Sequence, residues 1–201
     1  MATELRFYRD LAPILPVRTV RLHGFVVADG RTWLFLEDVG RRQYAYSDVD
    51  RTSLAQWLAV VHRITATADL SWLPSAGPDR YREHLQAGRR SILDNLSNPM
   101  LEADHRRDLV RVVEFLDRTD DRWPDIEGCL DGAPEVLVHG DLVAKNIRVR
   151  TEHGTTVMLP FDWETAGRGT AAPDLSTVED RMATNPDLAV YFAEAADLYP
   201  G

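Results

Sequence analysis

Cysteine is nearly missing from this chain of 201 residues, and no lysine occurs before Lys145. The single Cys129 excludes an internal disulfide and any cysteine-rich metal site, so a reducing compartment is expected. The chain also lacks a signal region in which a charged segment precedes an apolar one, and no run approaches the roughly 18 apolar residues of a membrane span. These absences predict a cytoplasmic protein with no membrane partner.

Positive charge is scarce as well. The chain carries 23 Lys and Arg against 32 Asp and Glu, which gives a formal net charge of -9. Because binding to a nucleic-acid backbone depends on clustered Lys and Arg, no nucleic-acid partner is expected. Hydrophobic residues make up 44% and charged residues 27% of the chain, as in ordinary globular proteins, and its length suffices for one sizeable core or two closely joined lobes.

Apolar periodicity predicts a hairpin followed by helices. Residues 17–28 and 31–39 are rich in Val, Leu, Phe and Trp, and they are joined at Asp29-Gly30, a dipeptide favoured in tight hairpin turns. Apolar residues then recur at helical spacing behind Thr52 and Ser53, either of which can serve as an N-cap. The remaining predicted elements are helices over residues 79–96, 102–118 and 186–198 and a polar, acidic connection over residues 124–134.

Residues 136–150, with the sequence VLVHGDLVAKNIRVR, are the most informative stretch, because they set an aspartate and an asparagine on one tight loop between two short apolar strands. Asp141 lies five residues before Asn146, and a further acidic residue, Asp162, follows the next apolar run. The residues between are typical of a hairpin that turns at residues 152–154. Such a hairpin brings Asn146 and Asp162 together.

The spacing of these polar groups suits the handling of phosphate and magnesium. Mg²⁺ takes oxygen ligands at about 2.0 to 2.1 Å and is usually held by one or two carboxylates together with substrate phosphates. Asn146 and Asp162 can supply two such oxygens from opposite ends of the hairpin. Asp141 is placed to accept the proton of an attacking hydroxyl group while a phosphoryl group leaves a nucleotide. His139 and Gly140 shape the loop in this interpretation.

His139-Gly140-Asp141, followed by Asn146 and then by Asp162-Trp163-Glu164, resembles the motifs of the aminoglycoside phosphotransferase and choline kinase-like family. The resemblance extends to residues 34–39, which are similar to the hinge of that family, and to residues 172–175, which are similar to its aspartate after the metal loop. It covers the chain from about Glu4 onward.

The resemblance implies an α+β, protein-kinase-like fold. Residues 1–40 would form the remnant of an N-terminal lobe with the hinge, and residues 41–201 a larger, mainly helical C-terminal lobe with the catalytic and metal loops. It also implies a phosphotransferase that moves the γ-phosphoryl group of ATP, or of GTP, to a hydroxyl group of a small molecule. Magnesium would be its cofactor.

The roles of single residues follow from the same resemblance. Asp141 would be the catalytic base, and Asn146 and Asp162 would hold the magnesium ion. Asp174 would brace the catalytic loop, and Lys145 would neutralise phosphate charge. His139 is counted with the catalytic residues, although in such a loop a histidine more often props the backbone. The residues expected beside the nucleotide are Leu36, Glu37, Asp38, Val39 and Glu4.

Two features of the family have no counterpart in the sequence, namely a glycine-rich turn over the phosphates and a lysine that pairs with a helix glutamate. Glu4 is similar to that glutamate, so the sequence begins about where the lysine strand of the family has ended. Either the start of a longer protein is absent, or part of the nucleotide grip has been lost. The second case predicts a pseudokinase that binds a nucleotide or a partner without turnover. A magnesium-dependent hydrolase is a third hypothesis.

The sequence leaves the acceptor and the oligomeric state open. Five acidic residues between positions 120 and 131 either line a pocket for a cationic acceptor or form a solvated acidic loop; they are Asp120, Asp121, Asp125, Glu127 and Asp131. Trp163 either anchors the core or walls the site beside the metal ligand. An exposed sheet edge in the small lobe would favour pairing with another chain.

Overall fold

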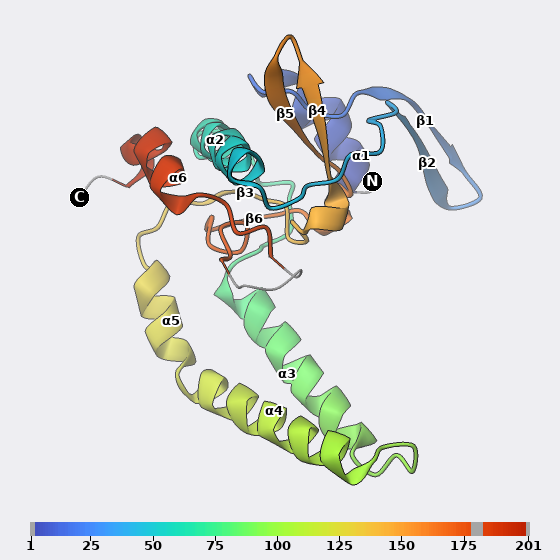
Figure 1. Ribbon diagram of the computed structural model, residues 1–201, viewed down its shortest axis with the longest axis vertical. Coiled ribbons are helices and arrows are strands. Elements are labelled where there is room, and N and C mark those ends of the chain that lie inside the picture. The colour runs from blue at the N-terminus through green and yellow to red at the C-terminus, as the bar shows by residue number, and fades with distance from the viewer. Residues whose placement is uncertain (1–2, 178–182, 200–201) are drawn as a thin grey trace. The chain divides into compact units, whose positions relative to one another are not determined.

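The computed structural model describes residues 3–177 and 183–199, which form two compact units (Figure 1). The first unit contains the described residues of Met1–Ser75 and Pro134–Gly201, and the second consists of Ala76–Ala133. The expected division into lobes at residue 40 stays a prediction. In the described parts of the chain, every helix is too short or too polar to cross a membrane.

The first unit begins with helical turns that bury one apolar face. Helix α1 (Thr3–Arg6) continues into the π-helical turn η1 (Phe7–Leu11) and the 3-10 turn η2 (Ala12–Ile14). The buried side chains of this face are Leu5, Phe7, Tyr8 and Leu11. Because these positions recur at helical spacing, the segment packs as one amphipathic helix would.

The predicted first hairpin is confirmed. Strand β1 (Leu22–Ala28) pairs antiparallel with β2 (Arg31–Leu36), and both are shorter than the stretches predicted for them. Asp29 and Gly30 have φ angles of +51° and +71°, as the favoured two-residue hairpin turn requires. Most side chains of strands β1 and β2 are exposed, among them Val27 and Trp33.

Helix α2 (Asp48–Thr65) begins earlier than predicted. Ser47 caps it, because its hydroxyl accepts a hydrogen bond of 3.2 Å from the Asp50 backbone N–H. The N-cap predicted at Thr52 or Ser53 is therefore wrong, since both lie inside the helix. Asp48 and Asp50 in the first turn favour the earlier start through the helix dipole.

The C-terminal helical segment packs against α2. It consists of α6 (Leu188–Glu194) and the 3-10 turn η5 (Ala196–Leu198), so the helix predicted over residues 186–198 is shorter and divided. The Asp187 side chain caps α6 by accepting a hydrogen bond from the Val190 backbone N–H at 3.2 Å.

Two short sheets position the motifs. Strand β3 (Val136–Val138) pairs antiparallel with β6 (Gly167–Gly169), and β4 (Ile147–Glu152) pairs antiparallel with β5 (Thr155–Pro160). The β4–β5 hairpin confirms the predicted turn, because His153 and Gly154 have φ angles of +51° and +82°. The 3-10 turns η3 (Ala144–Asn146) and η4 (Trp163–Thr165) adjoin its two ends.

The second unit is helical. It contains α3 (Pro78–Asn95), α4 (Ala103–Asp121) and α5 (Trp123–Leu130), and the first two confirm the predicted helices. The connection predicted over residues 124–134 is wrong, since most of it belongs to α5. Pro124 stands in the first turn of that helix, where the missing backbone N–H costs no hydrogen bond.

Candidate active site

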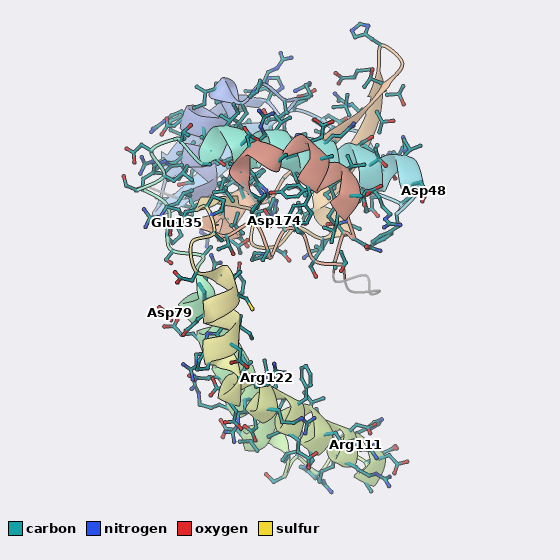
Figure 2. All side chains as sticks on the ribbon, turned by 90° about the vertical axis from the view of Figure 1, so that its left-hand side faces the viewer. Asp48, Asp79, Arg111, Arg122, Glu135 and Asp174 are labelled. Atoms are coloured by element: carbon teal, nitrogen blue, oxygen red, sulfur yellow. The ribbon has the colours of Figure 1, made fainter. Side chains whose placement is uncertain are left out.

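The loop after β3 is held by one buried carboxylate. Asp174 accepts hydrogen bonds from the backbone N–H groups of His139 at 2.8 Å and Gly140 at 3.4 Å, and it lies inside the first unit (Figure 2). Gly140 has a φ of +82°, and a Cβ atom there would lie 2.6 Å from the carbonyl oxygen of Thr165. Only glycine therefore fits the turn that presents Asp141.

His139 is buried and uses both ring nitrogens on the backbone. Its Nε2–H donates to the carbonyl oxygen of Phe161 at 3.0 Å, and its Nδ1 accepts from the Asp141 backbone N–H at 3.4 Å. This pair of roles requires a neutral imidazole. Burial lowers the pKa of His139, which also favours the neutral form. The ring thus connects the loop before Asp141 to the residue before Asp162.

Two side chains contact the Asp141 carboxylate. The Nδ2 of Asn146 donates to the Asp141 carbonyl oxygen at 2.9 Å and to its Oδ2 at 3.0 Å. The Lys145 Nζ lies 3.3 Å from the same Oδ2. Since the amide nitrogen of Asn146 is used in this way, its amide oxygen is the side-chain atom that could bind a metal ion.

Asp162 adjoins Asn146 across the end of the β4–β5 hairpin. The Phe161 backbone N–H donates to the Asn146 carbonyl oxygen at 3.0 Å, and Asp162 follows in the left-handed conformation, with φ 69° and ψ 60°. One carboxylate and one amide oxygen suit Mg²⁺, which completes its shell with phosphate oxygens and water. Within the described residues, no group of three His, Cys, Asp or Glu side chains offers a metal site built from the protein alone.

Glu4 and Phe7 attach the N-terminal helix to the segment after β5. Burial raises the pKa of the Glu4 carboxyl, and hydrogen bonds from the backbone of Trp163 and Asp162 oppose this rise. The ring of Phe7 stacks on Trp163, with centroids 3.7 Å apart and an angle of 14° between the planes. Trp163 is buried and packs in the core.

Glu37 of the expected hinge forms ion pairs with two arginines, which no local sequence pattern had indicated as its partners. Its carboxylate accepts from Arg18 at 2.6 Å and from Arg150 at 2.7 Å. Burial opposes the charge of Glu37, but these hydrogen bonds outweigh it and lower the pKa to about 2. Arg150 also donates to the Asp38 carbonyl oxygen, so strand β4 holds the backbone of the hinge.

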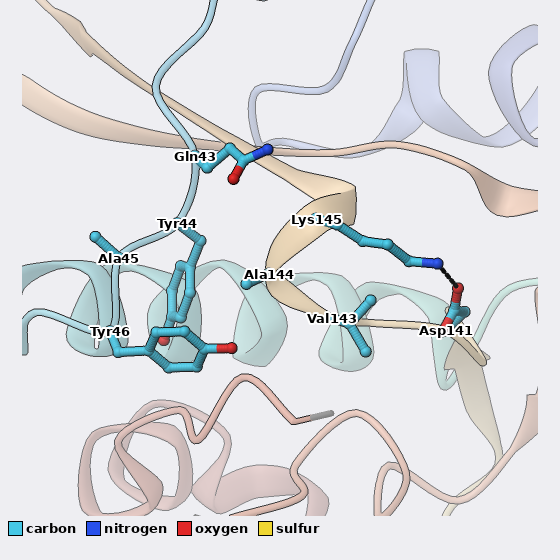
Figure 3. Close-up of a pocket in the computed structure, with 8 residues that line it drawn as sticks. All are labelled: Gln43, Tyr44, Ala45, Tyr46, Asp141, Val143, Ala144 and Lys145. Atoms are coloured by element: carbon cyan, nitrogen blue, oxygen red, sulfur yellow. Dashed lines mark ion pairs between the residues drawn. The ribbon is translucent and has the colours of Figure 1, made fainter. Parts of the chain in front are cut away.

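A cavity of about 660 Å³ adjoins Asp141 (Figure 3). One wall is the segment between the hinge and α2, and the other is the loop from Asp141 to Lys145. Its lining residues are Gln43, Tyr44, Ala45, Tyr46, Asp141, Val143, Ala144 and Lys145. The first four were not predicted as site residues, because no motif marks them. The predicted nucleotide residues Leu36, Glu37, Asp38 and Val39 do not line this cavity.

Several carboxylates of the second unit form ion pairs with arginines. Asp120 accepts from Arg82 at 2.7 Å, and Asp125 from Arg122 at 3.2 Å beside the junction of α4 and α5 (Figure 2). Asp117 is paired in the same way with Arg89. The pocket for a cationic acceptor that the acidic residues suggested stays a prediction, and of the five residues behind it Asp120 and Asp125 are paired with arginines.

The sequence matches the model of a known protein family over nearly its whole length. The model of a family described as the phosphotransferase enzyme family matches residues 1–200. No curated protein matches the sequence at a significant level.

Several solved structures share the fold at low identity. An aminoglycoside phosphotransferase in a complex with GDP and kanamycin is 15% identical with a TM-score of 0.61, and the match covers 96% of this chain and 67% of that one. An aminoglycoside phosphotransferase from Streptomyces rimosus, in complex with ADP and streptomycin, is 18% identical with a TM-score of 0.56, covering 98% and 67%.

A choline kinase from Cryptosporidium parvum is 14% identical with a TM-score of 0.58, covering 96% of this chain and 62% of that protein. The chain thus spans about two thirds of the length of these proteins. The predicted α+β, kinase-like fold is confirmed.

Proposed function

The chain belongs to the phosphotransferase enzyme family, and from this membership we propose that it moves the γ-phosphoryl group of ATP, or of GTP, to a hydroxyl group of a small molecule. The observation that carries the proposal is the position of Asp141. Its Oδ2 lies within 3.3 Å of both the Asn146 amide and the Lys145 ammonium group, at the edge of the cavity. A base, a metal ligand and a phosphate-binding cation thus share one loop.

Asp141 acts as the general base. It accepts the proton of the acceptor hydroxyl while the oxygen attacks the γ-phosphorus in line with the leaving group. The Asn146 amide aims the carboxylate by holding both the backbone and the side chain of Asp141. Lys145 lowers the negative charge that the incoming phosphate meets beside this carboxylate.

Asn146 and Asp162 would hold the magnesium ion, which neutralises charge on the phosphates when it is bound. His139 keeps these two segments in register, because its ring joins the Asp141 backbone to Phe161. Glu4 supports the same segment through the backbone of Asp162 and Trp163. The backbone of residues 36–39 faces the adenine ring in this proposal, and the Glu37 ion pairs keep that backbone in place.

The proposal is tested by transfer from radiolabelled ATP in the presence of Mg²⁺ and a set of hydroxyl compounds. Label that moves to an acceptor in the native chain and not in Asp141→Asn supports the transferase. Label that appears only as inorganic phosphate, at a rate independent of acceptor, contradicts it and supports the magnesium-dependent hydrolase.

A second candidate is a pseudokinase that binds a nucleotide or a partner without turnover. One observation favours it. The Glu4 carboxylate is engaged by the backbone of Trp163 and Asp162, and no Lys or Arg of the described residues forms an ion pair with it. The only lysine of the chain, Lys145, is instead paired with Asp141. Saturable nucleotide binding without transfer to any acceptor would support this candidate over the transferase.

A further inference from the structure

Tyr46 stands in a conformation that tyrosine rarely adopts. Its φ angle is +60°, in the left-handed region. For a residue other than glycine this backbone conformation costs on the order of 1 to 3 kcal/mol. Its side chain is one of those that line the cavity (Figure 3). It packs edge-to-face against Tyr44, with centroids 5.2 Å apart and planes at 75°. The fold therefore tolerates a strained backbone at the residue that presents this ring to the cavity.

Buried polar contacts fix this wall of the cavity from behind. Asp50 is fully buried, and its carboxylate accepts from the Ala45 backbone N–H at 2.9 Å and from Arg42 at 2.8 Å. The Tyr44 hydroxyl donates to the carbonyl oxygen of Thr184 at 2.7 Å. Because α2 and the C-terminal segment both hold residues 42–45, contacts within the protein fix this wall of the cavity.

The lining of the cavity is close to electrically neutral. Among the lining residues that the structure describes, Asp141 and Lys145 are the charged pair, and their charged atoms lie 3.3 Å apart. The next charged groups behind the wall, Arg42 and Asp50, neutralise each other at 2.8 Å. A polycationic ligand needs carboxylates that face it, because its amines lose hydration on binding. The described lining of this cavity offers one carboxylate, that of Asp141, and Lys145 is paired with it.

We infer that this cavity takes the acceptor of the proposed phosphoryl transfer, and that the acceptor is an uncharged hydroxyl compound with a flat face that stacks on Tyr46. An aromatic ring or the apolar face of a sugar ring has the required shape. The volume of about 660 Å³ suits a ligand of that size. That the ligand accepts a phosphoryl group rests on the proposed function. The chemical class of the ligand rests on the cavity alone.

The test compares two probes, phenyl β-D-glucopyranoside, which is neutral and flat-faced, and kanamycin, which is a polycation. Binding of each to the full chain is measured by ligand-detected NMR, with and without ATP and Mg²⁺, and phosphate transfer is followed in the same samples. Tyr46→Gly removes the ring and relieves the strain at positive φ, whereas Tyr46→Phe keeps the ring. Trp33→Ala removes an exposed aromatic ring of the β1–β2 hairpin as the matched control.

The expected result is binding of the glucoside that weakens about 10-fold or more in Tyr46→Gly. Tyr46→Phe and Trp33→Ala should keep the native affinity, and ATP should not displace the glucoside. Tighter binding of kanamycin, glucoside binding that ignores Tyr46, no glucoside binding, or displacement by ATP would each overturn the inference. Failure of the proposed function has a different signature, because phosphate transfer is then absent while Tyr46-dependent binding persists.

Discussion

Asn146 donates from one amide nitrogen to two oxygens of Asp141, the carbonyl at 2.9 Å and the carboxylate Oδ2 at 3.0 Å. The residue proposed to hold magnesium therefore also orients the proposed base. If both proposals hold, one side chain couples the ion to the base, and loss of the Asn146 amide should affect both.

The first prediction concerns the base. Asp141→Ala should lower turnover by about 10² to 10⁴, because the proton of the acceptor hydroxyl then has no partner in the transition state. Nucleotide affinity in the presence of Mg²⁺ should stay near the native value. Steady-state kinetics and a binding titration measure the two quantities, and an unchanged turnover would remove Asp141 from this role.

Asn146→Ala should reduce two properties together. It removes a proposed magnesium ligand and leaves the Asp141 carboxylate without its amide donor, so both metal-dependent nucleotide affinity and turnover should fall. In the double variant with Asp141→Ala, the loss of turnover should be smaller than the two single losses combined, because residues in contact are not independent. Additive losses would show that Asn146 does not act through Asp141.

Much of the fold follows from local sequence signals. Asp29-Gly30 and His153-Gly154 mark turns whose two residues need positive φ, and Asp141, Asn146 and Asp162 are brought to one loop cluster as predicted from their spacing. These features depend on residues close together in the chain. The same is true of α3 and α4, whose apolar periodicity is strong.

The features that the sequence did not reveal depend on residues far apart. Arg18 and Arg150 meet Glu37 across 19 and 113 residues, and no local pattern marks a partner at such a distance. The stacking of the Phe7 ring on Trp163 likewise joins residues that lie far apart in the sequence. Strand β6 is three residues long, too short for a periodic signal, and the ring of Tyr46 reaches the cavity through a backbone conformation that tyrosine rarely takes.

Gly140→Ala should destabilise the fold by about 2 to 5 kcal/mol, since it combines a left-handed backbone with a Cβ atom 2.6 Å from the Thr165 carbonyl oxygen. Gly154→Ala is the matched control, because its φ is also +82° but no atom lies within 4 Å of the added Cβ. That control should cost only about 1 to 2 kcal/mol. Urea unfolding gives both values, and equal costs would contradict the steric argument.

Glu37 should make stability depend on pH below its ordinary pKa of 4.5. In the folded protein the pKa of Glu37 is about 2, below this ordinary value. The contribution of Glu37 to the free energy of unfolding is therefore complete above pH 4.5 and is lost as the pH falls toward 2. With the side chain 14% exposed, the contribution is about 2 to 3 kcal/mol. Unfolding of the native chain and Glu37→Gln at pH 7 and pH 3 measures it.

The difference between the native chain and Glu37→Gln should be large at pH 7 and shrink at pH 3. Glu152→Gln is the control, because this carboxylate is 33% exposed and lies 3.5 Å from Arg150 and 3.7 Å from Arg18. It should change stability by less than about 1 kcal/mol. A difference for Glu37→Gln that does not vary with pH would contradict the assignment.

The most direct test of a working magnesium-dependent nucleotide site, which the account requires, is calorimetric titration of ATP into the chain with and without Mg²⁺, repeated on Asp162→Ala and Asp162→Asn. Asparagine tolerates the left-handed conformation of this residue, so Asp162→Asn removes the charge while keeping the backbone. Saturable binding that requires Mg²⁺ and disappears in both variants is the predicted result. Absence of binding in the native chain, or binding that ignores Mg²⁺ and Asp162, would contradict the account.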